Sequence, residues 1–347
     1  MSKLIIPEAK IINRPPWTVN PTKFVNTREF SAEAKNFLKY GYYTNAPEGS
    51  YEWKAYWDEQ NTRCKEGYTI GGVSISGRYY DYLNFTQIEA RVQDKKGRER
   101  RILTFPSFLD IDYYYYWELE AAMDAGEGMC VSKARRKGFS FKNAHMCKYD
   151  YNFVRDSSSV IGAYLDAYSA NTMNMVKVML NFLNKHTAWT KRRNPDAKDH
   201  VRARYENTIN GQKVWGGYNS QVYTLTFHNN ASAAIGKAIS FMLWEEAGKW
   251  NNLINSYNLT LPTFVDGDIT TGFWIIFGTG GDMDSGATAG FEELFYNPIK
   301  YKLRSYNLND YDQDQAGEAG FFVDDTWYKP PHLTEDGVSL RDSAIKS

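Results

Sequence analysis

Four short apolar runs, separated by segments with helical patterns, constrain the fold of this chain more than any other feature. The runs are GMCVSK (128–133), SSVIGAYL (158–165), AISFMLW (238–244) and TGFWIIFG (271–278). Continuous apolar runs of this length are typical of strands that are buried on both faces. Helices are predicted at 139–153 and 170–184, the second from Met, Val and Leu at helical spacing. Strands that alternate with helices predict an α/β fold, with a mostly parallel sheet and helices on both faces.

Residues 1–104 are predicted to form an N-terminal extension to this α/β part. A proline-punctuated arm, which we expect to be extended, precedes a predicted helix at 31–40. The aromatic stretch TIGGVSISGRYYDYLNF (69–85) has strand character. We therefore expect an aromatic, β-containing extension at 1–104, an α/β domain at 105–320 and a tail at 321–347.

Turn residues predict two hairpins. The basic segment QDKKGRERR (93–101) lies between two strand-like segments and is typical of a hairpin tip. The segment TINGQKVWGGYNSQVYTLTF (208–227) resembles a second hairpin, with turns at Asn-Gly and at Gly-Gly.

Composition excludes only a few classes of function. The chain has 41 basic and 41 acidic residues, so its bulk charge argues neither for nor against a nucleic-acid partner. Its three cysteines, without a CxxC pair, predict neither a disulfide framework nor a zinc site. The N-terminus lacks the apolar region of a signal peptide, and no apolar run reaches the roughly 20 residues that span a bilayer. We therefore expect a soluble, cytoplasmic protein without a membrane partner.

The segment VSKARRKGFSFK (131–142) follows a predicted strand and opens a predicted helix. A phosphate-binding loop needs this context, because a helix N-terminus offers free N–H groups and a positive dipole end to an anion. Against the pattern G-x-x-x-x-G-K-[ST], Gly138 takes the second glycine and Ser140 supplies the hydroxyl for Mg²⁺. Phe139 stands in place of the usual lysine, and Lys133 in place of the first glycine. An ammonium group at the start of the loop still reaches the β- and γ-phosphates. The alternative is an exposed basic turn.

The segment AISFMLWEEAGKW (238–250) ends an apolar strand in two adjacent carboxylates. Glu245 stands where such strands usually carry an aspartate, and its longer side chain is expected to act on Mg²⁺ through a bound water. Glu246 is then expected to orient or deprotonate the attacking water. The alternative is that both acids merely begin a helix, where negative charge is favoured.

The segment WIIFGTGGD (274–282) ends a third apolar strand in small residues. Its Thr279, with the neighbouring glycines, can bond to a γ-phosphate or to the acidic pair and move on hydrolysis; the alternative is an ordinary turn. A basic loop, an acidic strand and a small-residue strand end follow one another in the order typical of P-loop motor ATPases. The sequence therefore predicts a RecA/ASCE-like P-loop NTPase that binds ATP and Mg²⁺.

With these residues in place, roughly residues 70–325 resemble the ATPase domain of phage terminase large subunits. The loop KARRKGFS (133–140) is similar to the variant Walker A of lambda-like terminases and to that of gut phages related to the crAss-like group. LWEEAG (243–248) is similar to the family's Walker B and FGTGGD (277–282) to its coupling motif. NPIKYKLRSYNL (297–308) and AGFFVDD (319–325) resemble the segment that leads out of the ATPase domain.

The resemblance implies a DNA-packaging motor in the host cytoplasm. Its implied partners are double-stranded DNA, the portal protein, the small terminase subunit and further copies of the chain in a pentameric ring. Arg135 or Arg136 is implied to act on the γ-phosphate, where charge builds up in the transition state. The residues implied to bind the nucleotide are Lys133, Ala134, Lys137, Gly138, Phe139 and Ser140.

The chain departs from the family in two places. FPSFLDIDYYYYWE (105–118) lacks a clear adenine-contacting glutamine. Asp324, Asp325 and Glu335 do not form the clustered two-metal site of the family's nuclease, so we expect a motor without nuclease activity.

DNA contacts and two other classes of function stay open at this point. KKGRERR (95–101) and KRRNPDAK (191–198) are either phosphate-tracking clusters or solvated loops. A helicase-like P-loop translocase would need a second RecA-like domain, for which the chain is too short. A non-enzymatic virion structural or binding protein would account for 26 Tyr and 10 Trp. The hypothesis of a non-enzymatic protein is favoured if Lys133 and Glu246 do not converge on one pocket.

Overall fold

The computed structural model describes residues 26–93, 96–133, 138–191, 197–267, 269–279, 286–305 and 320–323. These residues pack as two units. The first comprises the described residues within 26–117 and 178–190, and the second those within 118–177 and 191–323. No helix in the described part of the chain combines the length and the apolarity needed to cross a bilayer. The predicted division at 104/105 and 320/321 stays a prediction.

The second unit is built on a sheet of seven described strands, in the order β13-β5-β12-β9-β6-β8-β7. All neighbouring pairs are parallel except β7 and β8, so the predicted mostly parallel sheet is confirmed. Four of the strands coincide with the four apolar runs of the sequence. The strands are β5 (Met129–Lys133), β6 (Ser158–Ala163), β7 (His200–Ile209), β8 (Gln212–Thr226), β9 (Phe241–Glu245), β12 (Phe273–Gly278) and β13 (Phe321–Val323).

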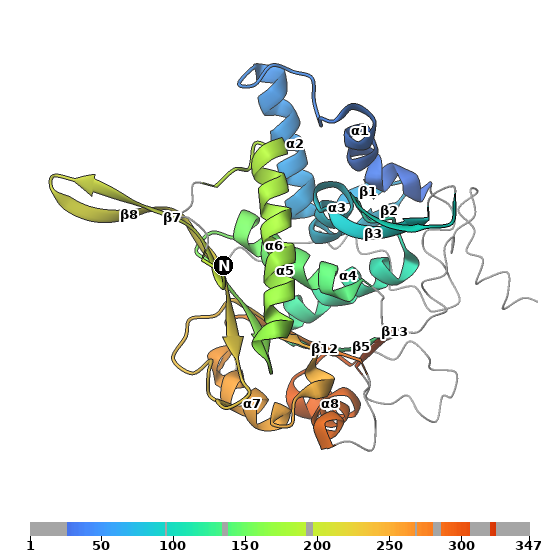
Figure 1. Cartoon of the computed structure of the whole chain (residues 1–347). Helices are drawn as coiled ribbons and strands as arrows, with labels where there is room; N and C mark the ends of the chain where they lie inside the picture. The colour runs from blue at the N-terminus through green and yellow to red at the C-terminus, as the bar shows by residue number, and fades with distance from the viewer. Residues whose placement is uncertain are drawn as a thin grey trace, which may run out of the picture. The chain divides into compact units, whose positions relative to one another are not determined.

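Helices cover both faces of this sheet, as predicted (Figure 1). Helix α5 (Phe139–Phe153) contacts β6, β8 and β9 on one side. On the other side, α8 (Gly286–Tyr296) contacts β5, and α7 (Leu253–Thr260) packs against α8. The remaining elements of this unit are α6 (Asp166–His186), which ends in the first unit, η3 (Ala247–Lys249), η4 (Leu261–Thr263), η5 (Ile299–Tyr301), β10 (Val265–Asp266) and β11 (Ile269–Thr270).

Aromatic side chains fill the core of the second unit. Trp244 of β9, Trp250 and Trp274 of β12 are each at most 1% exposed. The rings of Trp244 and Trp250 lie 5.2 Å apart, within the range of favourable aromatic contacts. Much of the aromatic content that the sequence left unexplained is therefore core packing.

The β7–β8 hairpin turns at Asn210 and Gly211, whose φ angles of 53° and 76° are those of a type I′ turn. The predicted Asn-Gly turn is confirmed. The predicted Gly-Gly turn is wrong, because Gly216 and Gly217 lie inside β8. Gly217, with φ at 122°, lies beside a break in the register after Arg202. A Cβ atom there would come within 2.7 Å of a backbone carbonyl, so the break requires glycine.

The first unit consists of short helices and two small antiparallel hairpins. Residues 69–85 are strands only in their first part, because Ser76 caps a helix by accepting a hydrogen bond from the Tyr79 amide at 3.2 Å. The predicted basic hairpin at 93–101 is confirmed by the pairing of β3 with β4. The elements are η2 (Thr27–Ser31), α1 (Ala32–Tyr40), α2 (Tyr51–Glu66), β1 (Tyr68–Ile70), β2 (Val73–Ile75), α3 (Gly77–Phe85), β3 (Ile88–Gln93), β4 (Glu99–Thr104) and α4 (Asp110–Ala125), which continues into the second unit.

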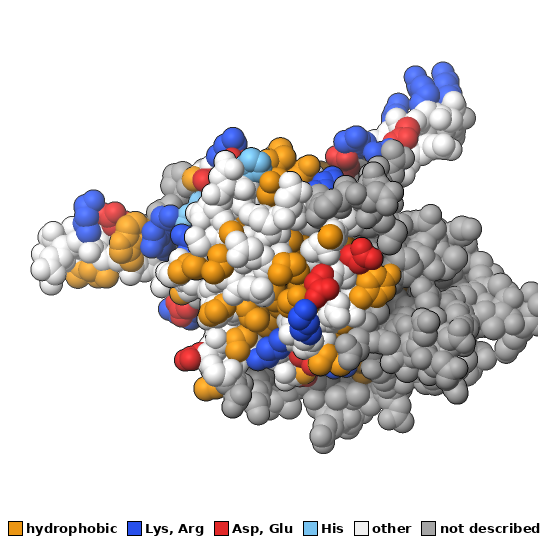
Figure 2. All heavy atoms as spheres, turned by 90° about the horizontal axis from the view of Figure 1, so that it is seen from below, with side chains coloured by type: hydrophobic (Ala, Val, Ile, Leu, Met, Phe, Trp, Pro, Cys, Tyr) orange, Lys and Arg blue, Asp and Glu red, His pale blue; other side chains and the backbone are white. Residues whose placement is uncertain are grey.

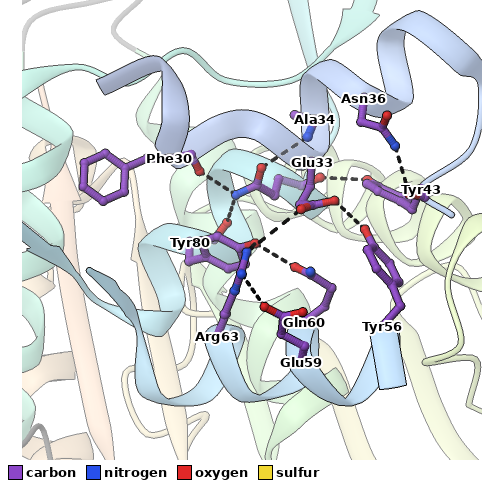
Figure 3. A network of polar contacts seen from close by, with 11 residues as sticks. Phe30, Glu33, Ala34, Asn36, Tyr43, Tyr56, Glu59, Gln60, Arg63 and Tyr80 are labelled. Carbon is purple, nitrogen blue, oxygen red and sulfur yellow. Dashed lines mark hydrogen bonds and ion pairs between the residues drawn. The ribbon is translucent and has the colours of Figure 1, made fainter. Parts of the chain in front are cut away.

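A polar network joins α1, α2 and α3 (Figure 3). Glu33 of α1 accepts a hydrogen bond from the Tyr56 hydroxyl of α2 at 2.5 Å. The Nη1 atom of Arg63 in α2 lies 4.0 Å from Oε1 of Glu33. The same nitrogen donates a hydrogen bond to the Tyr80 hydroxyl of α3 at 3.3 Å. Burial raises the pKa of Tyr56 and Tyr80, so both phenols stay neutral hydrogen-bonding groups. The network fixes the three helices in one arrangement.

Candidate functional site

Parallel pairing brings the carboxyl ends of three strands, β5, β9 and β12, to one edge of the sheet in the second unit. Strand β12 lies between β5 and β9, with Gly278 opposite Ser132 and Ile276 opposite Trp244. The residues that end or follow these strands therefore lie at the same edge. In α/β proteins this edge is where ligands bind.

Lys133 and Glu246 meet at this edge. The Nζ atom of Lys133 lies 3.5 Å from Oε1 of Glu246, although 113 residues separate them in the chain. The Lys133 side chain is only 7% exposed, so its ammonium group needs a partner, and Glu246 supplies one. The two residues that the sequence predicted to act together are thus brought together.

The backbone at Glu246 separates the two adjacent acids. Its φ and ψ angles of 50° and 47° are left-handed, which is uncommon for a residue other than glycine. Glu245 stays in β9, whereas Glu246 leaves the strand and faces Lys133. Glu246 occupies the N-cap position of η3, but its side chain makes no capping hydrogen bond to that turn.

Glu245 is buried and receives a hydrogen bond that the sequence did not predict. The Thr172 hydroxyl of α6 donates to its Oε2 at 3.0 Å. The pKa of Glu245 is raised to about 8, chiefly by burial and also by the neighbouring charge of Glu246, while the Thr172 hydrogen bond and Lys133 act in the opposite direction. No sequence pattern marks Thr172, because its role depends on the passage of α6 beside β9.

Lys249 is a second residue of the site that the sequence analysis missed. Its Nζ lies 3.8 Å from Oε2 of Glu246, so each oxygen of that carboxylate has its own lysine. The same ammonium lies 4.9 Å from the ring centre of Tyr168 at the start of α6. The spacing of three residues between Glu246 and Lys249 was the signal available in the sequence.

The end of β12 packs directly on the turn that carries Glu246. A Cβ atom on Gly248 would lie 2.4 Å from the Thr279 carbonyl oxygen, and one on Gly278 would lie 2.7 Å from the Gly248 nitrogen. Thr279 is buried at this contact. The third motif thus touches the second through its backbone, and a catalytic role for Thr279 stays a prediction.

After Lys133, the next described residue of the predicted phosphate loop is Gly138, which has a left-handed φ of 71° and precedes α5. Phe139 is 1% exposed and belongs to the core. Ser140 lies in the first turn of α5, half-buried. The remaining predicted residues Ala134, Arg135, Arg136, Lys137, Gly280 and Gly281 lie outside the described residues.

No protein-family model matches the chain, and no curated protein matches its sequence. Among solved structures, the large terminase ATPase domain of Thermus phage P74-26 aligns with a TM-score of 0.36 and 12% identity, over 50% of this chain and 64% of that one. A mutant of the same domain aligns with a TM-score of 0.38 and 13% identity, over 50% and 65%. The large terminase of bacteriophage HK97 aligns with a TM-score of 0.32 and 15% identity, over 46% and 32%. The chain thus spans less than two thirds of each of these proteins.

Proposed function

We propose that this chain is an ATPase of the phage DNA-packaging type and that it hydrolyses Mg-ATP at the edge where β5, β9 and β12 end. The observation that supports the proposal most is the meeting of Lys133 with Glu246 at 3.5 Å. A phosphate-binding cation and a carboxylate able to activate water are the two groups that such a reaction needs at one place.

The residues of the site suit Mg-ATP. The ammonium group of Lys133 matches phosphate oxygens in charge, and α5, which begins at Phe139, offers the free N–H groups and the dipole of a helix N-terminus. The Ser140 hydroxyl and the buried Glu245 carboxylate are oxygen donors of the kind that Mg²⁺ prefers. When bound, Mg²⁺ neutralises charge on the phosphate oxygens.

The two lysines on Glu246 suggest how the site is used. A triphosphate competes with Glu246 for Lys133, because both present oxygen anions to the same ammonium group. Lys249 keeps its contact with the other carboxylate oxygen and holds Glu246 in place. In this proposal Glu246 then orients the attacking water and accepts its proton. Arg135 or Arg136 stabilises the charge that develops on the phosphate. Thr279, which packs against the turn that carries Glu246, moves on hydrolysis.

The proposed motor acts on double-stranded DNA and works with the portal protein, the small terminase subunit and further copies of the chain. These partners follow from the likeness of the KARRKGFS, LWEEAG and FGTGGD segments to terminase motifs, including those of crAss-like phages. Much of the aromatic content that favoured a non-enzymatic binding protein lies in the core, which supports the enzymatic proposal over that alternative. In the described residues, the largest fully buried side chains include Trp244, Trp250, Trp274, Tyr115 and Tyr116.

The test is Mg-ATP binding by calorimetry, together with phosphate release. We expect the wild-type chain to bind, and Lys133→Ala to weaken binding at least tenfold, since one charge-assisted contact of about 1.5–3 kcal/mol is lost. Glu246→Gln should keep the affinity and lower turnover by about 10²–10⁴-fold. Lys237→Ala, at an exposed lysine outside the site, is the matched control. A folded wild-type chain that binds no nucleotide at millimolar concentration would contradict the proposal.

A further inference from the structure

The β7–β8 hairpin extends beyond the sheet as a two-stranded arm, which we define as residues 204–217 (Figure 1). In its second half, β8 pairs with β6 inside the sheet, from Gln221 to Thr226. The register break after Arg202 separates this part from the arm. The arm is therefore a distinct projection, and the proposed hydrolysis site does not use it.

The arm is preformed and presents large side chains to solvent. Its strands are joined by the tight Asn210–Gly211 turn, which matches the natural twist of a hairpin. Ile209, Val214 and Trp215 are 55%, 43% and 50% exposed. A two-stranded ribbon of this kind is marginally stable by itself, and exposed apolar groups on it are typical of a binding surface.

The charge of the hairpin is predominantly basic. Residues 200–218 contain Arg202, Arg204 and Lys213 against a single acid, Glu206, which pairs with Lys213 at 2.6 Å. The Arg204 guanidinium lies 4.5 Å from the Trp215 ring centre, so the aromatic ring supports the cation. Figure 2 shows basic and hydrophobic side chains side by side along this projection, at the left of the view.

The base of the arm repeats this combination of a cation and an aromatic ring. The Lys191 ammonium lies 4.4 Å from the ring centre of Tyr218. Arg155, which precedes β6, is 68% exposed and pairs with Asp156 at 3.6 Å. Lys191, the first residue of the basic cluster 191–198 of the sequence, thus lies at the foot of the arm.

We propose that the arm binds the sugar–phosphate backbone of double-stranded DNA. A two-stranded ribbon fits a DNA groove, whose width is about 12 Å on the major side. Arg204 and Lys213 supply the positive charge that phosphates require, from the same face of the ribbon as Trp215. The proposal rests on the proposed function in taking DNA as the partner, and it assigns the contact to a named element.

The test measures DNA affinity over a series of salt concentrations, by fluorescence anisotropy with a labelled duplex of mixed sequence. In the variant Arg204→Gln with Lys213→Gln, two phosphate contacts are lost, so affinity should fall by roughly tenfold or more. The slope of log affinity against log salt should become shallower by about 2. The matched control is Lys237→Gln with Lys300→Gln, which removes two exposed lysines outside the arm and should change neither quantity.

A shortened arm tests the element as a whole. Deletion of 206–209 and 212–215 places Tyr205 opposite Gly216 around the unchanged Asn-Gly turn, in the register that these residues already have. This variant should bind DNA as weakly as the charge variant or more weakly, while its ATP hydrolysis without DNA stays that of the wild type.

Three results would overturn the inference. They are wild-type DNA affinity in both arm variants, no measurable affinity in the wild type, and a loss of self-association with unchanged DNA affinity, which would make the arm a contact between copies. ATP hydrolysis without DNA separates this failure from that of the proposed function. A chain that hydrolyses ATP and binds DNA without its arm contradicts only the inference, whereas a chain that hydrolyses no ATP contradicts the proposed function.

Discussion

Lys133 stands where the usual phosphate-loop pattern has a glycine, and the usual lysine position holds Phe139, which is buried in the core. At the end of β5, the Lys133 ammonium reaches a carboxylate at the sheet edge. What matters for a phosphate-binding cation is the position of its charge, so the proposed function assigns that role to Lys133.

The contact between Lys249 and Glu246 predicts a positioning role for this lysine. Lys249→Met keeps most of the side chain but removes the charge, so Glu246 is held less well. We expect turnover to fall by about three- to tenfold, a modest effect because the pair is partly exposed. The KM for ATP should stay unchanged and Lys249→Arg should restore most of the rate. Steady-state phosphate release gives both constants, and an unchanged rate in Lys249→Met would contradict the role.

The raised pKa of Glu245 predicts that the stability of the protein without Mg²⁺ depends on pH. Between the ordinary pKa of 4.5 and about 8, the folded protein keeps a proton on Glu245 that the unfolded chain releases. This contribution to stability is fully present below pH 4.5 and is lost as the pH rises through about 8.

The comparison of the wild type with Glu245→Gln isolates this effect. The difference between their free energies of unfolding should fall with rising pH in this window, by up to about 1.4 kcal/mol per pH unit. Urea denaturation at several pH values between 5 and 9 measures it. A difference that does not change with pH would show that Glu245 titrates normally.

At the scale of elements, the strands of the second unit were predictable because burial on both faces leaves a continuous apolar run. We predicted strand character for the segment that forms helix α3, because its tyrosines favour strands. Two features of the structure mark it as a helix: Ser76 caps its N-terminus, and all its residues are buried. The contact of Thr172 was not predictable, since it depends on which elements become neighbours after folding. Lys249, by contrast, could have been found from its spacing of three residues to Glu246. The acids and Lys133 were predictable because they directly end apolar strands.

The close contact between η3 and the end of β12 predicts that Gly248 cannot be replaced. In Gly248→Ala, the new methyl group would collide with the Thr279 carbonyl, so the two strand ends must move apart. We expect the free energy of unfolding to fall by about 1–3 kcal/mol, with a loss of turnover because Glu246 shifts. Gly216→Ala is the control, since its methyl group would meet only the Tyr205 side chain, at 3.3 Å. Thermal unfolding measures the loss of stability, and phosphate release measures the loss of turnover. A Gly248→Ala protein as stable as the wild type would contradict the close packing of Gly248 on the Thr279 carbonyl.

The buried amide of Asn84 predicts a strong effect on the packing of α1 against α3. It accepts from the Ala34 amide at 3.2 Å and donates to the Phe30 carbonyl at 2.8 Å. Asn84→Ala leaves both backbone groups without this partner, which should lower the free energy of unfolding by about 1–3 kcal/mol for each buried group left unpaired. Asn36→Ala, which removes a half-buried amide of α1, should have a smaller effect. Equal effects of the two variants in urea denaturation would contradict the account.

For the whole molecule, the proposed site belongs to the second unit alone. Lys133, Thr172, Glu245, Glu246 and Thr279 come from four segments of that unit: the ends of the parallel strands β5, β9 and β12, and helix α6. The zero net charge of the chain gave no hint of function, although basic residues gather on the β3–β4 and β7–β8 hairpins. Bulk charge averages over surfaces that act separately, so a local excess has to be sought in individual segments and elements.

The most direct test of the central claim is a structure of the chain with Mg²⁺ and a non-hydrolysable ATP analogue. The account predicts that the Lys133 ammonium contacts the phosphates and leaves Glu246, while Glu246 stays beside Lys249 and faces the terminal phosphate. A nucleotide bound elsewhere, with the contact between Lys133 and Glu246 intact, would contradict the claim that these two residues form one hydrolysis site.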